Sequence, residues 1–148
     1  MKPGMRIKGG DELIAAFRYC AEKVPDHARR TMQNVTDKIV ILAKLQTPHD
    51  TGDLEDSIHK VVNRGERGRL EIDIVGGEGL DYAAEIDQNY SHMGIGPGTF
   101  AKMEANPGID IGEDFIGRAV DFYAEKLPEE IFQVTMQTIA ATALGDDK

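Results

Sequence analysis

The residues that could do chemistry gather between positions 49 and 59. Carboxylates and imidazoles bind divalent cations or transfer protons, and this segment contains His49, Asp50, Asp53, Glu55, Asp56 and His59. Their spacing matches neither an EF-hand loop, which needs acids at alternate positions before its glycine, nor an HExxH zinc motif. Acidic residues also stabilise the first turn of a helix. The spacing therefore favours local capping and solvation, with cation binding and catalysis as the alternatives.

Serine chemistry has little support in the sequence. Ser57 and Ser91 are the only serines, and neither lies in a GxSxG turn. Ser57 and His59 would share one face of a strand because they are two positions apart, but no third member of a triad is marked. A hydrolase therefore stays only as a residual hypothesis.

The motifs that could hold a cofactor are incomplete. Residues 94–99 lack the GK[ST] ending of a P-loop, and residues 77–82 lack the third glycine of a dinucleotide-binding turn. The single cysteine, Cys20, excludes an internal disulfide framework and a multi-cysteine zinc site, and its place in an apolar stripe predicts a core residue. The sequence thus predicts no cofactor and no metal.

Helical periodicity dominates the two ends of the chain. Apolar spacing predicts helices over 11–24 and 25–46, with Pro25 opening the second helix, and two further helices after position 115, with Pro128 opening the last. The second helix carries a stripe that we expect to be buried, composed of Ala28, Met32, Val35, Ile39, Leu42 and Gln46. With 148 residues, of which 41% are hydrophobic, the chain is expected to form a single domain over 1–148.

The middle of the chain alternates in the manner of strands. Residues 59–63, 70–75 and 82–86 are predicted to form three antiparallel strands, with a turn over 64–68. Five glycines, two prolines and weak periodicity predict a long mobile loop over 88–112. The predicted fold class is α+β, with long N-terminal helices packed on a small antiparallel β-sheet and followed by C-terminal helices.

Charge is distributed unevenly along the chain. The formal net charge is −9, but residues 1–69 carry +3 and residues 70–148 carry −12. The acidic balance argues against specific nucleic-acid binding, and neither a membrane-spanning apolar run nor a signal-peptide core is present in the sequence. Each half either has its own solvated face, or the basic side of one subunit meets the acidic side of an identical neighbour.

Four segments resemble, in order and spacing, the head-tail joining proteins of tailed bacteriophages, which include neck and tail-completion proteins. The matching segments are Gly10-Asp11-Glu12-Leu13, the central Pro48, Asp50, Thr51, Gly52, Leu54, Ser57 and Ile58, then Tyr82-Ala83 with Glu85-Ile86, and Phe115-Ile116-Gly117-Arg118-Ala119. Together they cover most of the chain.

The resemblance implies a structural virion protein that is not an enzyme. It implies a subunit of a homo-oligomeric ring in the neck, joining head to tail or completing the tail and contacting other neck or tail proteins. Such a protein resides in the virion, and in the host cytoplasm during assembly. The motif residues are then Asp50, Thr51, Gly52, Leu54, Ser57 and Tyr82. In the loop over 88–112, we expect Ile95, Gly96, Pro97, Gly98 and Phe100 to become ordered at an interface on assembly.

Two other functions remain open from the residues. A cytoplasmic helical adaptor or regulator would bind a protein partner through the helix at 25–46. A small hydrolase or metal-dependent enzyme would use the cluster at 49–59.

Overall fold

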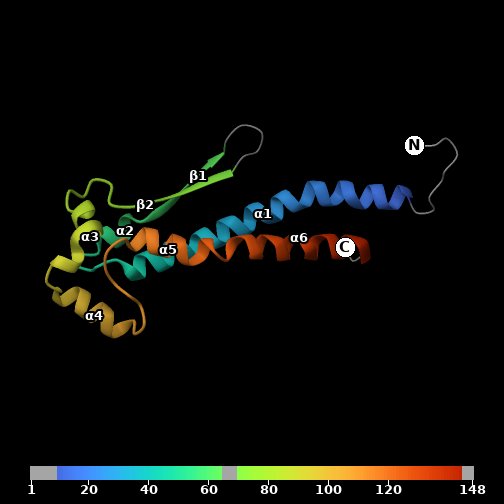
Figure 1. Cartoon of the computed structure of the whole chain (residues 1–148). Coiled ribbons are helices and arrows are strands. Elements are labelled where there is room, and N and C mark those ends of the chain that lie inside the picture. Colours follow the sequence, from blue (N-terminus) through green and yellow to red (C-terminus); the bar gives the residue numbers. More distant parts are fainter. Residues whose placement is uncertain (1–9, 65–69, 145–148) are drawn as a thin grey trace. The chain divides into compact units, whose positions relative to one another are not determined.

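A computed structural model describes the backbone of residues 10–64 and 70–144, and side chains within residues 25–64 and 70–141 (Figure 1). The elements in chain order are α1 (Gly10–Gln46), α2 (Asp53–Ser57), β1 (His59–Arg64), β2 (Leu70–Val75), α3 (Ala83–Asn89), the 3-10 helix η2 (Tyr90–His92), α4 (Pro97–Ala105), α5 (Phe115–Ala124) and α6 (Leu127–Leu144). They form two compact units: residues 33–127, and residues 1–32 with 128–148. The single domain over 1–148 stays a prediction.

The N-terminal helix is one element, not two. The prediction of separate helices over 11–24 and 25–46 is wrong, because α1 continues through Pro25. A proline removes one backbone hydrogen bond from a helix, but the residues on both sides of Pro25 keep helical spacing and the helix absorbs this loss. The side chain of Cys20, for which a core position was predicted, lies outside the described residues.

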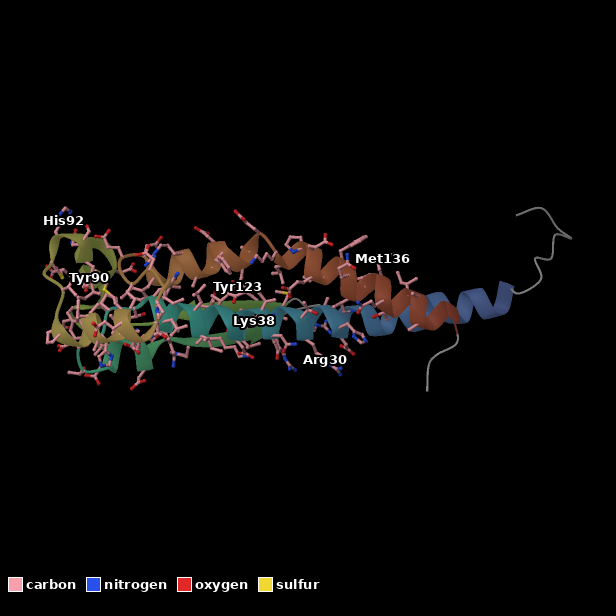
Figure 2. The ribbon with its side chains drawn as sticks, turned by 90° about the horizontal axis from the view of Figure 1, so that it is seen from below. Arg30, Lys38, Tyr90, His92, Tyr123 and Met136 are labelled. Atoms are coloured by element: carbon pink, nitrogen blue, oxygen red, sulfur yellow. The ribbon has the colours of Figure 1, made fainter. Side chains whose placement is uncertain are left out.

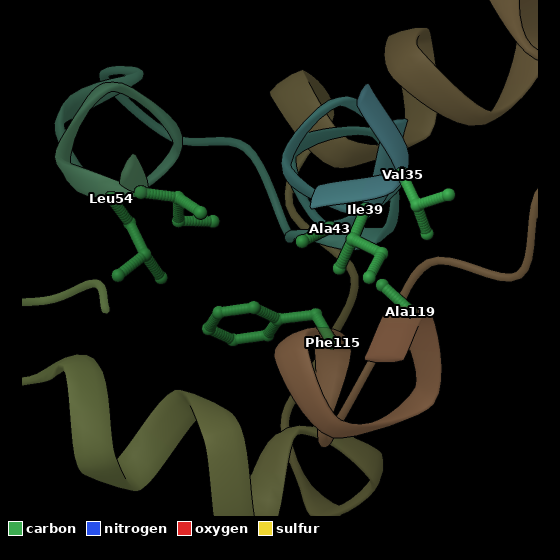
Figure 3. Packing of buried hydrophobic residues seen from close by; sticks show 7 residues of the cluster. Val35, Ile39, Ala43, Leu54, Phe115 and Ala119 are labelled. Carbon is green, nitrogen blue, oxygen red and sulfur yellow. The ribbon is translucent and has the colours of Figure 1, made fainter. Parts of the chain in front are cut away.

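The core of the larger unit joins α1, α2 and α5. Its buried members are Val35, Ile39 and Ala43 from α1, Leu54 from α2, Ile58 directly after α2, and Phe115 and Ala119 from α5 (Figure 3). The α1 members recur every four positions and therefore share one face of the helix. This confirms the predicted stripe at Val35 and Ile39. Leu42 and Gln46 are both half-buried, and Leu42 packs against the edge of the cluster.

The two-stranded antiparallel sheet packs on this core. β1 pairs with β2 in a register that runs from His59 opposite Val75 to Arg64 opposite Leu70, which confirms the first two predicted strands. Ile74 of β2 packs against the core cluster. The ammonium of Lys60 in β1 lies 2.6 Å from a carboxylate oxygen of Asp37 in α1. The fold class is thus α+β, with the N-terminal helix packed against the sheet, while the predicted turn at 64–68 falls largely outside the described residues.

The third predicted strand, over 82–86, is wrong, because this segment lies in and just before helix α3. Gly77 has φ +79° and its carbonyl accepts the N–H of Leu80, whose own carbonyl accepts the N–H of Ala83. These successive turns lead directly into the helix. Ala83 and Ile86 then both pack on the core, a spacing of three that suits a helix and not a strand.

The segment 88–112 also differs from its prediction as an irregular loop, because it contains η2 and the nine-residue helix α4. Pro97 occupies the first turn of α4, where its fixed φ favours a helix and its missing N–H costs nothing. Low apolar periodicity hid this helix, since its contacts are mainly polar. The mobility of the segment stays a prediction.

In the smaller unit, the first part of α1 lies alongside α6 (Figure 1). As predicted, Pro128 stands at the start of the last helix. Phe132, Met136 and Ile139 of α6 recur at helical spacing and are all largely exposed.

Two phenylalanines of α5 provide a matched test of the core. Phe115 is 3% exposed, whereas Phe122 is 52% exposed and touches Tyr123 and Lys126 at the surface. We expect Phe115→Ala to lower the free energy of unfolding by about 3–5 kcal/mol, because it leaves a cavity in the core. Phe122→Ala should cost less than about 1 kcal/mol. Urea denaturation measures both values, and equal losses would contradict the core described here.

Candidate functional site

One cavity of about 180 Å³ collects most of the predicted interface residues. The segment 48–54 forms one side of it, and residues between 82 and 99 form the other. The predicted residues that line it are Asp50, Thr51, Gly52, Leu54, Tyr82, Gly96, Pro97 and Gly98. Ser57, Ile95 and Phe100 do not line it. Residues of the central motif and of the predicted loop, more than 40 positions apart in sequence, therefore share one surface.

The lining of this cavity is mostly apolar. Pro48 and Leu54 are buried, and Ile86 and Met93 are half-buried side chains from the opposite side. Tyr90 is also buried, whereas His92, two residues later, is exposed (Figure 2). The Tyr90 hydroxyl has no hydrogen-bond partner within the described part of the chain. Such a lining suits an apolar side chain better than a charged ligand.

The segment 47–53 is shaped by a short set of local hydrogen bonds. Thr47 is fully buried after the end of α1, and its hydroxyl donates to the carbonyl of Ala43 at 2.7 Å. Gly52 has φ +93°, a conformation that L side chains rarely adopt, and it precedes the first residue of α2. The Thr51 hydroxyl donates to the carboxylate of Asp53 at 2.8 Å. The Thr-Gly pair of the motif is therefore a turn that directs the chain into α2.

Ser57 has a structural place in this turn. Its hydroxyl donates to the carbonyl of Leu54 at 2.6 Å and accepts the N–H of Gly77 at 2.7 Å, so it ties α2 to the end of β2. The ring Nδ1 of His59 contacts the carbonyl of Ser57 and not its hydroxyl. The geometry of a nucleophile activated by a neighbouring histidine is therefore not formed at this pair.

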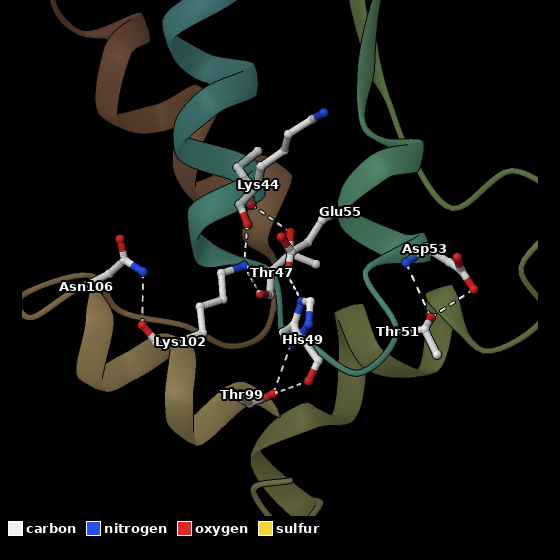
Figure 4. A network of polar contacts seen from close by, with 10 residues as sticks. Lys44, Thr47, His49, Thr51, Asp53, Glu55, Thr99, Lys102 and Asn106 are labelled. Carbon is white, nitrogen blue, oxygen red and sulfur yellow. Dashed lines mark hydrogen bonds and ion pairs between the residues drawn. The ribbon is translucent and has the colours of Figure 1, made fainter. Parts of the chain in front are cut away.

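Sequence reasoning missed the residue that anchors α4, which is Lys102. Its ammonium donates to the carbonyls of Lys44 and Thr47, both at 2.6 Å, and lies 2.8 Å from an oxygen of Glu55 (Figure 4). The side chain is only 11% exposed. A cation at this place satisfies carbonyls that the end of α1 leaves free and complements the negative end of the helix dipole. One signal was available in the sequence: Lys102 is the only Lys or Arg between positions 70 and 117.

Two further contacts complete this network. The same Glu55 oxygen lies 2.7 Å from Nδ1 of His49. The Thr99 hydroxyl donates to the His49 carbonyl and accepts the His49 N–H, both at 3.0 Å (Figure 4). His49 and Glu55, which could have served a metal or proton transfer, are thus engaged in holding α4. Among the residues that the structure describes, no group of three or more His, Cys, Asp or Glu side chains could hold a metal ion.

A second cavity, of about 570 Å³, lies on the other side of Tyr90. Arg118 donates from Nε to the carbonyl of Glu113 at 2.8 Å, and from Nη1 to Asp110. Hydrogen bonds from Ser91, including its N–H at 2.6 Å, hold the pKa of Glu113 below its usual value. Burial, and secondarily the neighbouring Asp114, raises the pKa of Asp87. These contacts fasten the residues around η2 to the start of α5.

Comparison with known families agrees with the arrangement of the motif. The model of the HK97-gp10-like family, described as a tail component of bacteriophage HK97, matches residues 11–91. The match covers more than half of the chain, so the chain belongs to this family, as the resemblance predicted.

The matched region contains α2, β1, β2, α3 and nearly all of α1, and therefore one side of the cavity and part of the other. No curated protein and no solved structure matches the chain. The part of the chain that the structure describes contains no helix long and apolar enough to cross a membrane.

Removing the Lys102 ammonium should release α4. Lys102→Met keeps much of the side chain but leaves two carbonyls and Glu55 without their cation, so we expect a loss of about 2–4 kcal/mol in the free energy of unfolding. Lys60→Met is the control, because its partner Asp37 is exposed, and should cost less than about 1 kcal/mol. Urea denaturation measures the loss, and hydrogen exchange should show the α4 amides opening first. Unchanged exchange in α4 would contradict the anchoring role.

Gly98 tests the close approach of α4 to the motif segment. A Cβ at this position would lie 2.8 Å from the His49 carbonyl oxygen, so Gly98→Ala should destabilise the fold by about 1–3 kcal/mol. Gly94 lies in the same segment, and a Cβ added there would meet nothing within 4 Å. Gly94→Ala should therefore stay within about 0.5 kcal/mol of the parent in the same denaturation experiment. Equal effects would show that α4 does not pack this closely.

Proposed function

We propose that the chain forms a homo-oligomeric ring in the neck of the virion, where it joins head to tail or completes the tail. The ring binds further copies of itself and other neck or tail proteins. Family membership supports the coarser part, a structural component of the phage tail found in the virion. The position in the neck and the closed ring are the proposal.

The observation that carries the proposal is the apolar surface beside the cavity. Ile95 is 57% exposed and Phe100 is 56% exposed, and both flank the cavity-lining residues 96–99. Tyr82, on the opposite side of the cavity, is also largely exposed. Large exposed apolar side chains on segments that also line a hollow mark a protein interface more often than a surface that stays in water.

The charge distribution supports a head-to-tail contact. The first half of the chain carries +3 and the second −12, so a basic surface of one subunit can meet an acidic surface of the next. Contacts between two different surfaces close into a ring when the rotation between subunits permits it.

The helical adaptor has less support. Its binding surface would be the apolar stripe of α1, but Val35, Ile39 and Ala43 on that side of the helix are buried in the chain's own core. A partner could reach them only by displacing α5 or α2. The exposed Ile41 lies on a different face of α1, at 61% exposure.

The double variant Ile95→Ala with Phe100→Ala tests the proposal in particles. Both side chains are exposed, so we expect the thermal midpoint to stay within a few degrees of the parent while incorporation into virions falls about tenfold. The measurement is the amount of this protein in purified particles, from a phage that lacks the gene and is complemented with each variant. Native mass spectrometry of the purified chain reports whether rings form.

The matched control is Ile41→Ala, which removes an equally exposed side chain from α1. We expect particles of this variant to contain normal amounts of the protein. Normal incorporation of the Ile95 and Phe100 double variant would remove the cavity surface from the interface.

A further inference from the structure

The segments that line the apolar cavity carry exposed carboxylates. Asp50 lines it and is exposed, and the exposed Asp81 and Glu85 directly precede the lining residues Tyr82 and Ile86. The sequence from 70 to 101 contains no Lys or Arg. The cation that follows, Lys102, is almost fully buried and paired with Glu55. An occupant of this cavity should therefore combine apolar side chains with positive charge.

The size of the cavity narrows the occupant further. About 180 Å³ lies below the range of roughly 300–1,000 Å³ that is typical of sites for small molecules. It is suited to one or two side chains that enter from a peptide segment. The peptide backbone would stay at the mouth, near the exposed Asp50 that lines the cavity.

The chain itself contains one segment with this composition. Residues 2–8 read Lys-Pro-Gly-Met-Arg-Ile-Lys, so Met5 and Ile7 alternate with Arg6 and Lys8. In an extended peptide, alternate residues point to opposite sides. Met5 and Ile7 would then face the cavity, while Arg6 and Lys8 leave the opposite side of the peptide and reach carboxylates on the protein only through their long, flexible side chains. The other basic segment, residues 64–69, contains three arginines but no apolar side chain.

We propose that residues 2–8 of a second copy dock into this cavity. The proposal rests on the ring proposed above and names the contact that would link one subunit to the next. A segment on one subunit and a hollow on its neighbour are two different surfaces, so the contact is of the head-to-tail kind that closes rings. Met5 or Ile7 supplies the anchor, and Asp50 and Glu85 hold the flanking cations.

The first test measures binding of a labelled peptide of residues 2–8 to the full chain by fluorescence anisotropy. We expect saturable binding that weakens as salt is raised, since the carboxylates are exposed. A peptide with Met5→Ser and Ile7→Ser should bind at least about tenfold more weakly, because it lacks the anchors. The chain with Asp50→Lys and Glu85→Lys should also bind the parent peptide at least about tenfold more weakly. If neither the changed peptide nor the changed chain binds more weakly than the parent pair, the proposal is overturned.

The second test exchanges the charges in the full chain and follows the oligomer by native mass spectrometry. Arg6→Glu with Lys8→Glu should reduce assembly about tenfold, and adding Asp50→Lys with Glu85→Lys should restore it. The matched control, Arg64→Glu with Arg67→Glu, makes the same charge change in the other basic segment and should leave assembly intact. If the control variant alone abolishes assembly, the segment at 64–69 is the occupant and the proposal is overturned.

The outcomes separate this inference from the proposed function. Rings and virions that tolerate Arg6→Glu with Lys8→Glu would leave the ring standing and overturn the docking of residues 2–8. Peptide binding without rings or virion incorporation would support the cavity as a peptide site and remove the neck function. If Asp50→Lys with Glu85→Lys weakens binding of the peptide but leaves the oligomer mass of the full chain unchanged, the cavity binds residues 2–8 of its own chain. That result overturns a second copy as the occupant.

Discussion

The larger unit depends on the ammonium of Lys102 at the end of α1. It satisfies two carbonyls, of Lys44 and Thr47, and pairs with Glu55, so a single cation joins α1, α2 and α4. Burying a charge costs desolvation energy, and the contacts that compensate for it must be formed together. The net contribution of such an interaction to the free energy of unfolding is small. Its main effect is to favour one arrangement of α1, α2 and α4 over others. Lys102 and Thr99 both connect α4 to the segment that follows α1, so the position of α4 depends on this arrangement.

The cavity is a consequence of that anchor combined with two backbone constraints. Gly52 takes a positive φ and turns the chain into α2, which places Leu54 in the core beside the hollow. Gly98 lets α4 approach the His49 carbonyl closely, so Pro97 and Thr99 reach the opposite side. Glycine is needed at the two positions for different reasons. Gly52 adopts a positive φ that other residues rarely adopt, whereas at Gly98 a side chain would collide with the His49 carbonyl. A motif that has the pattern of a simple turn therefore also defines one side of the cavity.

The parts of the fold that depend on local pattern could be predicted from the sequence. The apolar stripe of α1 and the alternation in β2 both reflect burial of one face, and burial leaves a period in the sequence. The segment 82–86 is too short for its period to separate strand from helix, and the turns at Gly77 and Leu80 decided the outcome. Helix α4 could not be predicted in this way, because its position depends on Lys102 and residues more than 50 positions away. Long-range polar contacts leave no periodicity. The candidate site shows the same division: its motif residues were recognisable, but nothing in their spacing places them around one hollow.

The contacts around the cavity also account for the histidine and the carboxylates at 49–55. In the described part of the chain these side chains form no organised catalytic cluster. His49 and Glu55 hold the wall of the cavity from within, while the exposed Asp50 can face a partner from outside. The same short segment thus supplies both buried contacts that hold α4 and an exposed carboxylate at the cavity. In the ring proposed above, this arrangement would couple the shape of the interface to the stability of the fold: a change that loosens the wall would also remove the surface that the next subunit contacts.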